Sequence, residues 1–124
     1  MSTIPNDVRR FVLTSVPSVP YLEAALLMRD SAHRSWSVAE LAASLYVPER
    51  TAADLVDALA EAGIARLEAS RYRYEPRDES LRDSLDRLAD CYAADLVGVS
   101  NLIHDATQKS ASRFAAAFKL RKDT

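Results

Sequence analysis

The sequence predicts a mainly α-helical protein. Only two glycines occur among 124 residues, 48% of the residues are hydrophobic, and the apolar side chains recur mostly at steps of three and four. Such steps place apolar side chains on one face of a helix, whereas a half-buried strand alternates apolar and polar residues. The length is that of one domain large enough to bury a core.

Two helices are expected before the centre of the chain. Residues from Pro5 to about Ser15 place their apolar side chains on one side of an amphipathic helix. Pro17 and Pro20 end this helix and force a short extended link. The next helix, from about Tyr21 to Arg29, is nearly apolar and is therefore expected in the core.

Residues 35–63 are expected to form two short helices joined by a tight turn. Ser37 can cap the first helix, and Glu40, three residues later, can reach back to complete a capping box. Pro48 cannot continue that helix but suits the first turn of a second one. Gly63 supplies a left-handed stop to the second helix. Together these signals are typical of a helix-turn-helix.

Beyond residue 63 the pattern changes to that of strands. Residues 64–68 and 71–75 suit two short strands joined near Ala69 and Ser70. In the second strand, side chains alternate between two tyrosines on one face and two arginines on the other. Pro76 ends the pairing. A two-stranded β-hairpin is therefore predicted directly after the second helix.

In this order of elements the segment from Ser37 to Pro76 resembles the winged helix-turn-helix domain of bacterial transcriptional regulators, broadly of the MarR or ArsR kind. The resemblance is carried by SVAELAASLYVPERTAADLVDALAEAGIARLEASRYRYEP, above all by LAxxLxV, a turn and then LxxALxxAGI. It implies a recognition helix that begins near Pro48 and enters the major groove, and a wing at the minor groove or backbone. The expected fold class is a mainly α winged helix-turn-helix with a short two-stranded β-wing, an N-terminal helix and a long C-terminal helix.

The resemblance also implies which residues contact DNA. The candidates are Ser37, Arg50, Thr51, Arg66, Arg71 and Arg73. A net charge of −2 gives no overall basic field, and the outward positions of the second helix carry four acidic residues that phosphates repel, namely Glu49, Asp54, Asp57 and Glu61. Tyr46 fills a turn position where many relatives use glycine.

Each arginine group has an alternative role. Arg50 can pair with Asp54, four residues along the same helix. The hairpin arginines can simply keep an exposed hairpin soluble and protect its edge. A winged helix that binds no DNA, and instead offers its acidic helix face and C-terminal tail to another protein, is the alternative function.

The last long element is expected to be one helix from Asp78 to about Thr107. About thirty residues at 1.5 Å per residue span roughly 45 Å, which exceeds a compact domain built from the preceding residues. Its apolar stripe consists of Leu81, Leu85, Leu88, Tyr92, Leu96, Val99 and Ile103. A second copy of the same helix is the simplest partner, so a homodimer with this stripe as its interface is predicted.

The chain is accordingly divided into two parts. Residues 1–77 would hold the N-terminal helix and the winged helix-turn-helix, and residues 78–124 the long helix and a basic tail. The tail carries Phe114 and Phe118 among four basic residues. It can act as a clamp within the chain or the dimer, or as a docking segment for a partner protein or for the DNA backbone.

No enzyme activity, metal or cofactor is predicted. His33 and His104 lack neighbours at metal-ligand spacing, and no glycine-rich phosphate loop or nucleophile motif occurs. The start, MSTIPNDVRRF, lacks the apolar run of a signal peptide, and no stretch reaches the roughly 20 apolar residues of a membrane span. With Cys91 as the single cysteine, a cytoplasmic protein without membrane contact is expected. Its expected partners are double-stranded DNA and a second copy of itself.

Overall fold

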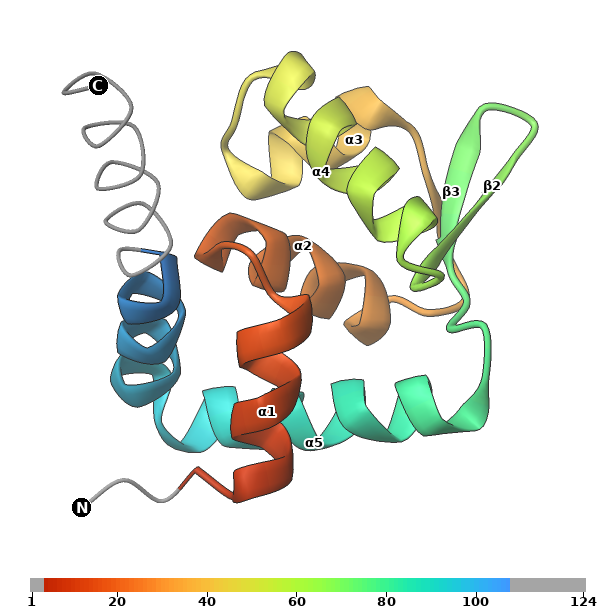
Figure 1. The fold of residues 1–124 in the computed structure, drawn as a ribbon. Helices are drawn as coiled ribbons and strands as arrows, with labels where there is room; N and C mark the ends of the chain where they lie inside the picture. Colours follow the sequence, from red (N-terminus) through yellow and green to blue (C-terminus); the bar gives the residue numbers. More distant parts are fainter. Residues whose placement is uncertain (1–3, 108–124) are drawn as a thin grey trace, which may run out of the picture. The chain divides into compact units, whose positions relative to one another are not determined.

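The computed structural model describes residues 4–107 (Figure 1). The predicted basic tail lies outside the described residues. The described part is mainly helical and contains one small antiparallel sheet. Its elements are α1 (Asn6–Ser15), α2 (Val19–Asp30), β1 (Ser35–Trp36), α3 (Val38–Leu45), α4 (Glu49–Glu61), β2 (Ala65–Glu68), β3 (Arg71–Tyr74) and α5 (Glu79–Ala94), and residues 96–107 are again helical.

The described chain divides into two compact units. The sheet unit comprises residues 20–89, and the end unit comprises residues 4–19 and 90–107. This division differs from the predicted boundary after residue 77, because the first part of α5 belongs with the sheet. Two contacts hold it there: Arg29 Nε donates to Asp86 Oδ1 at 2.8 Å, and the Arg82 guanidinium lies 5.9 Å from the centre of the Tyr74 ring.

The sheet has three strands in the order β1-β3-β2, with all neighbours antiparallel. The sequence predicted only the hairpin β2–β3, and the missing strand is β1, in which Trp36 pairs with Tyr72. The Trp36 side chain is buried. A strand of two residues is too short to show an alternating pattern, so β1 depends on a partner far along the chain.

The predicted helix signals around α3 and α4 are confirmed. Ser37 Oγ accepts a hydrogen bond from Glu40 N at 3.1 Å, and Glu40 Oε1 accepts one from Ser37 N at 2.8 Å. Pro48 is the N-cap of α4 rather than a residue of its first turn. Gly63 has φ of +78°, and a Cβ there would lie 2.9 Å from Arg77 Cδ, so the position requires glycine for both conformation and space.

The predicted hairpin is also confirmed. Ala69 and Ser70 join its strands with φ of 50° and 66°. Positive φ at both residues is the geometry of a type I′ turn, which matches the twist of two-residue hairpins. Along β3 the side chains alternate between exposed and buried, with Tyr72 and Tyr74 buried.

The predicted continuous helix from Asp78 to Thr107 is wrong. Asp78 does cap the start of α5, since its Oδ1 accepts from Leu81 N at 2.8 Å. The helix ends at Ala94, however, and Asp95 is not helical. Asp95 Oδ1 accepts from Gly98 N at 3.0 Å and so caps a new helical segment. Gly98 permits this bond, because a Cβ at residue 98 would collide with the Asp95 carboxylate.

The reason for expecting a dimer through the apolar stripe is also wrong in part. Four residues of the stripe are buried within a single chain and need no second copy, namely Leu85, Leu88, Val99 and Ile103. Leu81 and Tyr92 are half-buried, while Leu96 is 55% exposed. The homodimer stays a prediction. In the single chain, the end unit exposes the large apolar residues Leu13, Leu96 and Val97.

Candidate nucleic-acid interface

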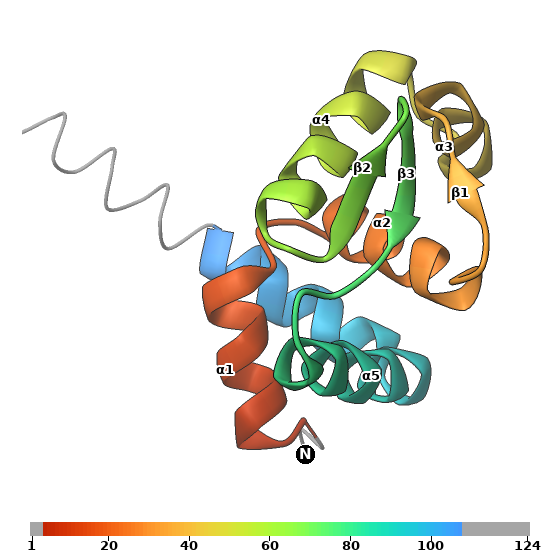
Figure 2. The ribbon, with the colours of Figure 1, turned by 90° about the vertical axis from the view of Figure 1, so that its right-hand side faces the viewer.

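Helix α4 presents one apolar and one polar side. Its buried residues are Ala52, Val56 and Leu59, which follow helical spacing and fix the helix against the rest of the sheet unit beside β2 (Figure 2). Its exposed residues are Glu49, Arg50, Thr51, Asp54, Asp57 and Glu61. The polar side therefore carries four carboxylates and one guanidinium, as the sequence predicted.

Arg50 and Thr51 lie in the first turn of α4 and are both exposed. Within residues 4–107 no ion pair joins Arg50 to Asp54, so the alternative role proposed for Arg50 is not observed. Pro48, as the N-cap, offers no side-chain hydrogen bond to the first amides of the helix. An exposed cation, a hydroxyl and the positive end of the helix dipole thus meet at the start of α4.

The hairpin arginines lie on a different face from the tyrosine that meets α4. The Tyr72 hydroxyl donates to Asp57 Oδ1 of α4 at 2.7 Å, which also raises the pKa of Tyr72. Arg71 and Arg73 flank Tyr72 on β3 and so point to the opposite face of the sheet. Arg66 on β2 lies directly opposite Arg73 in the strand register, so its side chain points to the same face.

The structure therefore brings the candidate residues together in two groups. Arg66, Arg71 and Arg73 form one group on the outer face of the sheet. The start of α4, with Arg50 and Thr51, forms the other. The sequence had treated all of them as a single DNA-contacting set.

Arg71 binds within the chain. Its Nε donates to Ser35 Oγ and its Nη2 to the Ser35 carbonyl, both at 3.0 Å, and Nη2 also pairs with Glu40. Arg34 reaches the same carboxylate at 3.3 Å. Arg71 and Ser37 thus act together through Glu40 to fix β3 and β1 to the start of α3. Local sequence signals do not reveal this role, because it depends on the pairing of β1 with β3.

This network lowers the pKa of Glu40 to about 2, first through the hydrogen bond from the Ser37 amide and then through Arg71. Because the folded-state pKa is lowered, the stabilisation by Glu40 is complete above its ordinary pKa of 4.5 and is lost as the pH falls towards 2. The Glu40→Gln variant should therefore lose part of the pH dependence of stability in this window. Thermal unfolding of wild type and variant between pH 2 and pH 7 measures the difference.

The matched control is Glu68→Gln, at an exposed glutamate of the hairpin. Its stability should follow the wild-type pH profile between pH 2 and pH 5. The interpretation fails if the Glu40 and Glu68 variants show the same profile.

Comparison with protein-family models, curated proteins and solved structures found no significant match.

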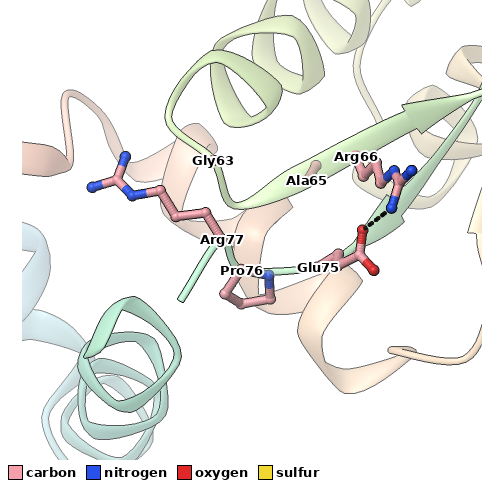
Figure 3. A pocket seen from close by; sticks show the side chains of 6 residues that line it. All are labelled: Gly63, Ala65, Arg66, Glu75, Pro76 and Arg77. Atoms are coloured by element: carbon pink, nitrogen blue, oxygen red, sulfur yellow. Dashed lines mark hydrogen bonds and ion pairs between the residues drawn. The ribbon is translucent and has the colours of Figure 1, made fainter. Parts of the chain in front are cut away.

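A shallow hollow of about 390 Å³ lies beside the hairpin (Figure 3). Arg66 Nη1 contacts Glu75 Oε2 across it at 3.2 Å. Arg77 Nη1 donates to the Ala62 carbonyl at 3.3 Å, and its Nε lies 3.5 Å from Asp78. Both arginines of the hollow are thus already engaged, whereas Arg73 is exposed and has no ion-pair partner among residues 4–107.

Residues 4–107 contain no group of three or more His, Cys, Asp or Glu side chains able to hold a metal ion. No single helix of this part is long and apolar enough to cross a membrane, and α1 and α2 reach that length and apolar content only when taken together.

Proposed function

We propose that the sheet unit is a winged helix-turn-helix module that binds double-stranded DNA and regulates transcription, with α4 as the helix in the major groove. The observation that carries this proposal is the order α2, β1, α3, α4, β2 and β3 combined with the strand order β1-β3-β2. In this arrangement a tight turn joins α3 to α4, and α4 keeps one long side exposed beside a hairpin.

The candidate residues would not contribute equally to DNA binding, because some of them already bind within the chain. Arg50 and Thr51, exposed at the start of α4, are suited to phosphate oxygens or base edges. Arg73 is the hairpin arginine best placed to reach the DNA backbone, since Arg66 and Arg71 already pair with carboxylates. Ser37 keeps its capping bond and contributes mainly by fixing α3.

The proposal includes a homodimer, because two copies of α4 about 34 Å apart would read two half-sites one helical turn apart. A second copy would cover the exposed apolar residues of the end unit, Leu13, Leu96 and Val97. Sedimentation equilibrium at micromolar concentration tests this part of the proposal. A single copy under those conditions would contradict it.

A titration of labelled duplex DNA, followed by fluorescence anisotropy at several salt concentrations, tests DNA binding itself. We expect saturable binding at about 50 mM salt, with an affinity that falls linearly on logarithmic axes as salt rises, because bound arginines release counterions. Absence of binding at the lowest salt would contradict the proposal.

A second function is favoured by one observation, the four carboxylates against one guanidinium on the exposed side of α4. This charge suits a basic protein partner better than a phosphate backbone. Lack of DNA binding at low salt, together with binding of a lysine-rich peptide that Asp54→Asn weakens, would favour this protein-interaction module.

A further inference from the structure

Tyr46 has a backbone conformation that tyrosine rarely adopts. It is the C-cap of α3, with φ of 57° and ψ of 45°, and its N–H bonds to the Ala42 carbonyl. This left-handed conformation is normally adopted by glycine or asparagine, because a Cβ atom crowds the following carbonyl oxygen and asparagine offsets that strain by local hydrogen bonding. Glycine or asparagine would therefore suit the local fold better than tyrosine does.

The Tyr46 side chain is neither buried nor hydrogen-bonded within residues 4–107. It is 94% exposed, and no hydrogen bond of its hydroxyl is present among residues 4–107. Of the other tyrosines, Tyr21, Tyr72 and Tyr74 are buried and Tyr92 is half-buried. A strained backbone that carries a fully exposed aromatic ring is typical of a residue kept for binding.

The position of Tyr46 indicates the ligand. It precedes Pro48, the N-cap of α4, so a phenol hydroxyl, the Arg50 guanidinium and the Thr51 hydroxyl all belong to residues 46–51. These three groups are hydrogen-bond donors, and such donors contact phosphate oxygens in protein–DNA complexes. Glu49 in the same stretch carries a negative charge, which phosphates repel.

We infer that Tyr46 is a DNA-contacting residue whose hydroxyl donates to a backbone phosphate beside the groove that α4 enters. This inference rests on the proposed function and adds to it a residue that fixes the position of α4 on the duplex. A phosphate contact from a neutral phenol adds affinity without adding a positive charge.

The test compares Tyr46→Phe, which removes the hydroxyl alone, with Tyr46→Asn, which also relieves the left-handed strain. Both should weaken binding of a labelled duplex by about tenfold, the effect of one hydrogen bond to a charged group. The slope of affinity against salt should stay at the wild-type value, because no charge is lost. The melting temperature of Tyr46→Asn should equal or exceed that of the wild type, which shows that the loss is not caused by unfolding.

The control is Ser80→Ala, which removes an exposed hydroxyl in the first turn of α5 and should bind as the wild type does. If the wild type binds DNA and both Tyr46 variants bind it with the same affinity, the inference is overturned and the proposed function stands. Loss in Tyr46→Asn with full retention in Tyr46→Phe would overturn the phosphate contact. Absence of DNA binding by the wild type would overturn both.

Discussion

Replacing Arg50 by glutamate should weaken binding of duplex DNA by at least about tenfold at low salt. Arg50 is exposed in the first turn of α4 and has no ion-pair partner among residues 4–107, so its guanidinium is available to a phosphate or a base edge. A glutamate would also add to four carboxylates on the same side of the helix. If Arg50 neutralises one phosphate, the logarithmic salt slope should decrease by about 1. Anisotropy titrations at several salt concentrations measure both quantities.

The matched control is Arg10→Glu, which makes the same charge change at an exposed position of α1 in the end unit. It should leave the affinity within about twofold of wild type, because salt screens an exposed charge that makes no contact with the DNA. Equal losses in the two variants would mean that net charge, and not the start of α4, governs binding. Both are surface substitutions and should change the stability by less than about 0.5 kcal/mol.

Replacing Leu59 by alanine should lower the free energy of unfolding by about 2–5 kcal/mol. Leu59 lies on the buried side of α4 with 0% of its surface exposed, so its removal leaves a cavity in the sheet unit. Urea unfolding followed by circular dichroism measures the loss. The control is Leu67→Ala on β2, where the leucine is 54% exposed and the expected cost is below about 1 kcal/mol. Similar losses in both variants would contradict the assignment of the apolar side of α4 to the core.

Local sequence signals predicted much of the sheet unit. The capping box needs only a serine and a glutamate three residues apart, and the structure contains both of its hydrogen bonds at Ser37 and Glu40. Gly63 ends α4 because glycine tolerates positive φ, which is a property of one residue. The hairpin followed from alternation over residues 64–75 and a two-residue turn. In each case the physical cause lies within a few residues of its effect.

Features that depend on distant residues were missed. Strand β1 exists through its pairing with β3, and Arg71 bonds to Ser35 and Glu40 through that pairing. The helix break has a local signal, since Asp95 precedes Gly98 by the three residues of a cap. The unbroken apolar spacing on either side concealed this signal. Burial of four of the seven stripe residues depends on tertiary packing, which the spacing of one helix does not reveal.

The candidate site was predicted in composition but not in arrangement. Arg50, Thr51 and Arg73 are exposed as expected. Arg66 instead pairs with Glu75, and Arg71 with Glu40. Alternation along β3 gave the face of each arginine correctly. It could not give the carboxylate that each would meet, because that depends on the strand register and on α3.

Backbone-amide NMR of the isotopically labelled protein, recorded during a titration with duplex DNA, tests most directly whether α4 is the helix that contacts DNA. We predict the largest shift changes in residues 46–54, with smaller changes in the hairpin and none in α1. Changes confined to α1 and residues 96–107, or a spectrum unaltered by excess DNA at low salt, would contradict the assignment of α4.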